Sequence, residues 1–189
     1  MGEPPSWYPG TEAKPAPMPL LRVQGFVNTR DLEDETDLLD IPATARAWLL
    51  EAGLLDGASS LSASDLERAR AVREAIRALI EAGGAEGDGA LEPLRRLAAS
   101  HHAQLTLAKD GAIELENRRS GGLDDGLFEL LLIIHRAQQD GTWARLKICA
   151  NHECEWAFFD RSRNQQGNWC DMAVCGNRLK NRELRARRR

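Results

Sequence analysis

The spacing of the four cysteines constrains this 189-residue chain more than any other feature of its sequence. Cys149 and Cys154 form one pair, and Cys170 and Cys175 form another, with four residues inside each pair and fifteen between the pairs. Two thiolates so close in sequence can bind one metal ion from a single turn, and a second pair completes a tetrahedron. The pattern therefore predicts one structural Zn²⁺ ion bound by all four cysteines.

Other uses of four cysteines fit this spacing less well. Two disulfides would need an oxidising compartment, and the proline-rich segment 1–21 lacks the apolar core of a signal peptide, so we expect a cytoplasmic protein. Iron–sulfur clusters usually bring three cysteines closer together than they are here. A catalytic zinc ion needs an open coordination position, whereas four thiolates close its shell.

Charge divides the chain into two unlike parts. Residues 1–144 hold 14 Lys and Arg against 24 Asp and Glu, a net charge of −10, whereas residues 145–189 hold 11 against 5, a net charge of +6. An acidic body with a basic end is typical of a protein that contacts polyanions at that end. No apolar run approaches the length of a membrane span, so we expect no membrane partner.

Hydrophobic periodicity predicts a fold that is mainly α with one small β-hairpin. We expect a disordered leader over residues 1–20 and a helical domain over residues 21–144. Helices are predicted at 21–32, at 42–55, after a capping box at 64–67, at 91–101 and at 123–139. Alternating aliphatic residues around Lys109-Asp110-Gly111 predict the hairpin, at 104–115.

No candidate catalytic constellation stands out in this helical part. It offers no nucleophile beside a base, no phosphate-binding glycine loop and no pair of acids at a characteristic spacing. We therefore expect that the protein is not an enzyme.

Residues 145–189 are expected to form the four-cysteine zinc finger, built from short strands and a C-terminal helix. Leu146–Ile148 should be a strand before the first cysteine pair. The β-prone 156–159 should turn back near 165–168 and resume as a strand at Trp169. The second pair should open a helix from about 172 to about 187, with several arginines on one face.

Basic side chains on this small unit suit contact with nucleic acid, because guanidinium groups offer forked donors and stay charged. A basic C-terminal helix can also simply complement the helix dipole. The residues expected to contact nucleic acid are Arg161, Arg163, Arg178, Lys180, Arg182 and Arg185. The alternative is a zinc-stabilised adaptor that docks an acidic protein partner and binds no nucleic acid directly.

Two further residues are expected to support the metal centre. The Asn177 amide can brace the second cysteine pair by satisfying backbone groups or a thiolate. Arg178 can either bridge Asp160, which would then support the site indirectly, or reach a phosphate.

The cysteine spacing, together with Asp160, Ser162-Arg163-Asn164 and Cys175-Gly176-Asn177-Arg178, resembles the CGNR zinc-finger family, which is named after the last four of these residues. The resemblance covers about the last 45 residues. The tip at 165–168, which is often basic in the family, is uncharged here. Upstream, Phe26-Val27-Asn28-Thr29, 47–49 and 53–55 are similar to motifs of the ABATE domain of stress-induced transcription regulators.

This resemblance implies a bacterial DNA-binding transcription regulator that contains zinc. The finger would grip DNA, and the helical domain would sense a signal or form a homodimer.

Overall fold

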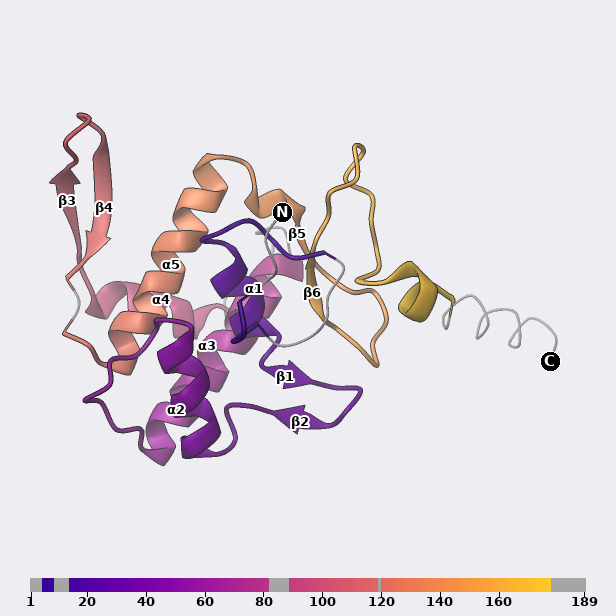
Figure 1. Ribbon diagram of the computed structural model, residues 1–189, viewed down its shortest axis with the longest axis horizontal. Coiled ribbons are helices and arrows are strands. Elements are labelled where there is room, and N and C mark those ends of the chain that lie inside the picture. The colour runs from indigo at the N-terminus through magenta and orange to yellow at the C-terminus, as the bar shows by residue number, and fades with distance from the viewer. Residues whose placement is uncertain (1–4, 9–13, 82–88, 119, 178–189) are drawn as a thin grey trace.

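The computed structural model describes residues 5–8, 14–81, 89–118 and 120–177, and Figure 1 shows the arrangement. The helices are α1 (Leu21–Val27), α2 (Pro42–Glu51), α3 (Ala63–Glu81), α4 (Glu92–Ser100) and α5 (Leu123–Gln139). The strands are β1 (Arg30–Asp31), β2 (Thr36–Asp37), β3 (Ala103–Leu107), β4 (Ile113–Asn117), β5 (Leu146–Ile148) and β6 (Ala157–Phe159). A 3-10 turn at Trp143–Arg145 precedes β5, and a π-helical turn spans Met172–Gly176. The mainly α fold class is thus confirmed.

The long helix α3 lies at the centre of the helical body and contacts the other four helices. Its apolar residues recur at helical spacing and face the core, as the sequence predicts. The buried members of this stripe are Leu66, Ala69, Val72, Ile76 and Ile80. Helix α5 runs beside it with the same bounds as predicted, and its middle is buried at Leu127, Leu130 and Ile133.

Helix α3 begins at a different capping box from the one expected at Ser64 and Glu67. The Asp65 amide donates to the Ser62 hydroxyl at 3.2 Å, and the Asp65 carboxylate accepts from the Ser62 amide at 2.7 Å. These are the reciprocal bonds of a capping box, with Asp in place of Glu. The helix therefore starts at Ala63, because the pair at Ser62 and Asp65 satisfies the first free amides.

The prediction of a disordered leader is wrong for the parts of it that the structure describes. Trp7 and Tyr8 are buried in the main core. The ring centroids of Trp7 and Trp48 are 6.0 Å apart, and the two rings meet edge to face. The Gln24 amide donates to the Tyr8 hydroxyl at 2.5 Å. Proline-rich composition favours disorder, but large aromatic side chains bury enough apolar area to hold a short segment in place.

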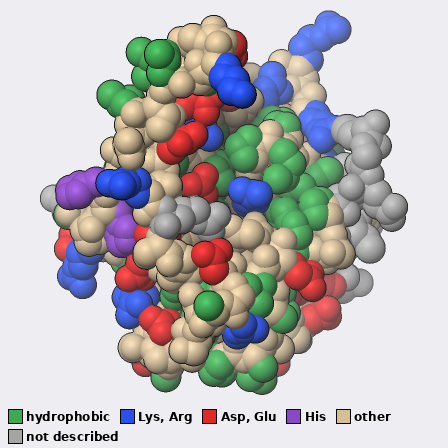
Figure 2. All heavy atoms as spheres, turned by 60° about the vertical axis from the view of Figure 1, so that its left-hand side comes forward, with side chains coloured by type: hydrophobic (Ala, Val, Ile, Leu, Met, Phe, Trp, Pro, Cys, Tyr) green, Lys and Arg blue, Asp and Glu red, His purple; other side chains and the backbone are tan. Residues whose placement is uncertain are grey.

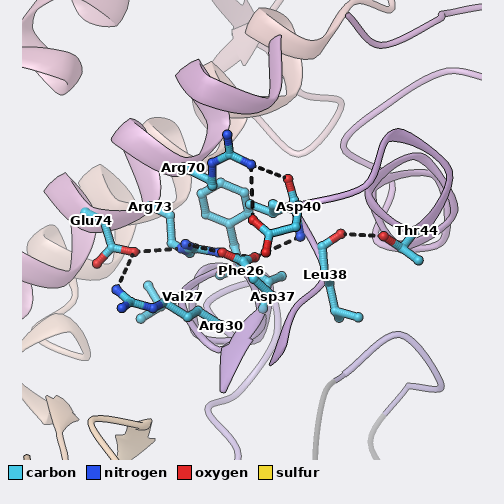
Figure 3. Close-up of polar contacts among 12 residues, drawn as sticks. Phe26, Val27, Arg30, Asp37, Leu38, Asp40, Thr44, Arg70, Arg73 and Glu74 are labelled. Atoms are coloured by element: carbon cyan, nitrogen blue, oxygen red, sulfur yellow. Dashed lines mark hydrogen bonds and ion pairs between the residues drawn. The ribbon is translucent and has the colours of Figure 1, made fainter. Parts of the chain in front are cut away.

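Strands β1 and β2 form a short antiparallel pair that a buried arginine ties to α3. Arg73 donates two hydrogen bonds to the Asp37 carboxylate, at 2.6 and 2.7 Å, and Figure 3 shows these groups together. Nearby, Arg70 pairs with Asp40 at 3.2 Å. The ion pairs of Asp37 and Asp40 therefore attach this short strand pair to α3.

The expected hairpin forms from β3 and β4, in antiparallel register with Leu105 opposite Leu115 and Leu107 opposite Ile113. It projects from the body at the end opposite β5 and β6 (Figure 1). Arg136 of α5 donates to the carbonyl of Leu115, in the middle of β4, at 2.5 Å. The hairpin and the cysteine-bearing segment thus occupy opposite ends of the molecule.

Candidate metal centre

Strand β6 lies between two hydrophobic cores and positions the cysteine cluster. Successive side chains of a strand point to opposite faces. Ala157 and Phe159 accordingly join the core of the helical body, whereas Phe158, between them, packs with the cysteines. All three are buried. The finger is therefore built directly onto the helical body.

The strand pairing of the finger differs from the one expected. Strand β6 pairs with β5, Leu146 opposite Phe159, and no strand resumes at Trp169 among the residues described there. A backbone hydrogen bond of 2.9 Å, from the Ala150 amide to the Asn168 carbonyl, links the returning segment to the first cysteine pair. The chain does return, but no strand forms at Trp169, because β6 pairs with β5 on one edge and its Phe159 and Ala157 amides are bound by Lys14 and Asn28.

The four cysteines converge on one point. Their sulfur atoms all lie within 4.8 Å of one another, and Cys170 Sγ is 3.6 Å from both Cys154 Sγ and Cys175 Sγ. A tetrahedral zinc ion with bonds of about 2.3 Å holds its sulfur ligands about 3.8 Å apart. The four side chains are free thiols, and Cys149, Cys154 and Cys175 are buried. The donor set and its spacing thus fit a tetrahedral metal ion.

Four sulfur atoms this close cannot all be thiolates unless a cation lies between them. Contacts with the Cys154 and Cys170 thiols lower the pKa of Cys149. Proximity to Cys149, and then to Cys154, raises the pKa of Cys170 far above its usual value. Four thiolates this close repel one another, and a divalent cation removes the conflict because each sulfur then becomes a ligand.

Backbone and amide groups around the cysteines hold both pairs in place. Asn151, which is 1% exposed, points its Nδ2 at Cys175 Sγ from 3.8 Å, and its carbonyl accepts from the Cys154 amide. The Asp171 carboxylate caps the π-helical turn by accepting from the amides of Ala173 and Val174 at 2.6 and 3.1 Å. Amide contacts of this kind fix thiolate ligands and tune their charge.

Asn177 braces the second cysteine pair in one of the two ways expected, by satisfying a backbone group and not a thiolate. Asn177 donates to the Ala173 carbonyl at 3.0 Å and so braces the turn through its backbone, while Asn151 supplies the amide near a sulfur. Sequence inspection missed Asn151, although its place between Cys149 and Cys154 was a usable signal.

Asp160 shapes the loop that follows β6. Its carboxylate accepts from Lys147 Nζ at 3.0 Å and from the amides of Ser162 and Gly167 at 2.9 and 2.7 Å. Burial alone would raise the pKa of Asp160, but hydrogen bonds from Ser162, Lys147 and Gly167 lower it strongly. The loop between 160 and 167 is thereby held out from the finger as a fixed protrusion, visible beyond β6 in Figure 1.

Two of the residues expected to contact nucleic acid lie on this loop. Arg161 and Arg163 are both exposed, and Arg161 also donates to the Pro15 carbonyl at 2.6 Å. The other four, Arg178, Lys180, Arg182 and Arg185, lie outside the described residues, as does the predicted helix beyond Asn177.

Polar side chains of the helical body bind the backbone of β6 and of Glu155 just before it, and sequence inspection missed them. The Asn28 side chain both donates to the Ala157 carbonyl at 3.0 Å and accepts from the Ala157 amide at 2.7 Å. Gln24 donates to the same carbonyl at 3.0 Å, and Arg77 reaches the Glu155 carbonyl. Asn28 ends α1 as its C-cap, earlier than the predicted end at 32, and no local pattern in the sequence predicts its contact with the finger.

Comparison with known families agrees with this architecture. Residues 145–188 match the CGNR zinc finger, which defines the cysteine-bearing end as a finger of that class. Residues 23–140 match the ABATE family, described as "Putative stress-induced transcription regulator". The chain therefore belongs to the ABATE family, with a CGNR zinc finger following its helical domain. No curated protein matches the chain. Among the described helices, none is long and apolar enough to cross a lipid bilayer.

Proposed function

We propose that this protein is a transcription regulator whose zinc finger, holding one structural Zn²⁺ ion, binds the phosphate backbone of DNA. The observation that carries the proposal is the convergence of four sulfur atoms in a unit that belongs to a known zinc-finger class and bears the basic end of the chain. Cys149, Cys154, Cys170 and Cys175 would ligate the ion, which closes the coordination shell and leaves no open position for catalysis.

The basic side chains divide into two groups in this proposal. Arg163 stands on the loop that Asp160 and Lys147 fix, so its guanidinium group is presented without a large loss of loop entropy on binding. Residues 178–189 supply seven of the positive charges, among them Arg182 and Arg185. Each phosphate contact releases counterions, so binding should weaken steeply as salt rises.

The helical body would supply regulation. Its net charge of −10 over residues 1–144 disfavours contact with DNA, so the body is better suited to sensing a signal or to forming a homodimer. The alternative function is a zinc-stabilised adaptor that uses the same basic end to dock an acidic protein.

Charge reversal of two arginines tests the proposal. We expect Arg182→Glu/Arg185→Glu to weaken binding of a random duplex by at least about tenfold at moderate salt, because two phosphate contacts become repulsive. The Glu114→Lys/Glu116→Lys variant, on the distant hairpin, changes the charge equally in size and should not weaken binding. Fluorescence anisotropy with labelled duplex measures both. Unchanged binding by the arginine variant would favour the adaptor.

A further inference from the structure

The loop between β6 and the second cysteine pair is narrow, because one carboxylate joins its two arms. The buried Asp160 carboxylate accepts from the Ser162 amide at 2.9 Å and from the Gly167 amide at 2.7 Å. Arg145, from the turn before β5, donates to the carbonyls of Asp160 and Ser162 at 3.1 and 3.2 Å. The loop therefore projects as a narrow protrusion with a fixed base (Figure 1).

Two exposed amide side chains meet at the tip of this loop. Asn164 Nδ2 donates to Gln166 Oε1 at 3.3 Å. Gln165, between them, has a left-handed backbone with a φ of 51°, which few non-glycine residues adopt, and its carbonyl accepts from Lys147 Nζ. Each amide of the pair restricts the rotamers of the other. Less side-chain entropy is therefore lost when the pair binds a partner.

The amide pair presents a hydrogen-bond acceptor beside donors. Gln166 Oε1 is occupied, so Asn164 Oδ1 remains as an acceptor, while Gln166 Nε2 and the second hydrogen on Asn164 Nδ2 remain as donors. An adenine in the major groove shows the complementary pattern, an N6 donor beside the N7 acceptor. A guanine shows two acceptors there, so its O6 would face Asn164 Oδ1 and repel it.

The surroundings of the pair favour DNA as the partner. Residues 161–168 include two arginines and no acid. The exposed Arg163, next to the pair, has no hydrogen bond or ion pair with any other residue that the structure describes, so its guanidinium group is free for a phosphate. By contrast, acidic side chains stand among the basic ones on the face that Figure 2 brings forward.

The shape of the loop also suits a groove of DNA. The major groove is about 12 Å wide and admits a two-stranded ribbon. The two arms of the loop are separated at their base by a single carboxylate, that of Asp160, so the loop is about as broad as such a ribbon.

We propose that the tip of this loop contacts an adenine in the major groove of duplex DNA through the amides of Asn164 and Gln166, while Arg163 binds a neighbouring phosphate. The inference rests on the proposed function and deepens it. The basic side chains supply affinity for any duplex, whereas the amide pair makes binding depend on the base sequence.

Selection from a random duplex pool by the full zinc-loaded chain tests the inference. The bound duplexes should be enriched in adenine at one or more positions, compared with the unselected pool. Replacing such an adenine by 7-deazaadenine removes the N7 acceptor and keeps the base pair. We expect this replacement to weaken binding of the selected duplex about tenfold, as measured by fluorescence anisotropy.

Asn164→Ala/Gln166→Ala should bind the adenine and 7-deazaadenine duplexes equally, because no amide remains at the tip to distinguish them. The matched control is Gln104→Ala, which removes an exposed amide from β3 at the opposite end of the molecule and should keep the difference between the duplexes.

Three results would overturn the inference while leaving duplex binding in place. They are a selected pool without enriched adenine, wild-type protein that binds both duplexes equally, and a double variant that still distinguishes them. The comparison of duplexes uses the wild type, so it decides the question even if the double variant misfolds. A wild type that retains no duplex at low salt would contradict the proposed function itself, and the inference with it.

Discussion

At the scale of single residues, the best-defined polar contact in the helical body is the pair of Arg73 and Asp37. Arg73 is only 2% exposed, and it donates to both carboxylate oxygens of Asp37 and, at 3.2 Å, to the Thr29 hydroxyl. Glu74 adds a further contact at 2.9 Å. Figure 3 shows Arg73 between Asp37 and Glu74. A buried guanidinium group that loses its main partner is costly, because nothing replaces the lost hydration.

Asp37→Asn tests this pair through its pH dependence. Burial alone would raise the pKa of Asp37, but the hydrogen bonds from Arg73 and the Leu39 amide lower it below its usual value. The pair therefore stabilises the fold fully above the unfolded pKa of about 3.9, and this stability is lost as the pH falls through the lower, folded pKa. We expect Asp37→Asn to cost about 3 kcal/mol at neutral pH, and the cost to shrink below about pH 4.

Urea unfolding of both proteins at several pH values measures this difference, and any loss of metal in acid affects both alike. The matched control is Asp40→Asn, since Asp40 pairs with Arg70 but its side chain is 62% exposed. That change should cost less than about 1 kcal/mol. A cost for Asp37→Asn that stays constant down to pH 3 would show that the pair contributes no charge-dependent stability.

At the scale of elements, α5 crosses the segment after α2 at very close range, at Gly126. A Cβ atom placed on Gly126 would lie 1.7 Å from the Leu54 carbonyl oxygen, which is backbone and cannot rotate away. Helix α5 can therefore cross this segment only with glycine at that position. The apolar pattern of α5 predicts that the helix is buried. It does not predict that Gly126 is the residue in contact with the backbone of Leu54.

Gly126→Ala should lower the stability by about 3 kcal/mol or more, because α5 or the Leu54 segment must move. Gly122→Ala is the control, since a Cβ atom there meets nothing within 4 Å. Thermal unfolding followed by circular dichroism compares the two variants with the wild type. Equal melting temperatures for both variants would mean that the crossing can relax at no cost.

The elements also show which parts of the fold the sequence can predict. The bounds of α5 and the register of β3 with β4 follow from periodicity and from one turn, both of which are local. The cap of α3 fell two residues from its expected place because the stretch before the helix offers two serines, Ser62 and Ser64, with an acid three residues after each. β6 pairs with β5 while packed against the helical body. No local sequence pattern predicts such a long-range contact.

At the scale of the whole molecule, the finger and the helical body are one packed unit. Ala157 and Phe159 belong to the body's core, and Asn28 bonds both backbone groups of Ala157. From the leader, Lys14 reaches over the finger, donating to the Trp169 carbonyl at 2.5 Å and lying 4.9 Å from the Phe158 ring centre. Loss of the proposed zinc ion should therefore destabilise the body as well, because β6, which follows the first cysteine pair, is bound by Gln24 of α1 and by Asn28 at its end.

Contacts between distant parts of the chain limit how much of the site can be predicted from the sequence. The cysteine spacing predicts the ligand cluster because metal geometry demands it, and the structure brings those four residues together. The contacts of Asn28, Gln24 and Arg77 with the finger join residues more than 75 positions apart. Polar side chains at such separations carry no periodic signature, so only the folded chain shows them.

The most direct test of the central claim is duplex binding across a salt series, with and without zinc. We expect the zinc-loaded protein to bind random duplex DNA with an affinity that falls steeply as salt rises, and to lose this binding when a chelator removes the ion and returns when zinc is restored. Failure of the zinc-loaded protein to bind even at low salt, or binding that is indifferent to chelation, would contradict a DNA-binding zinc finger.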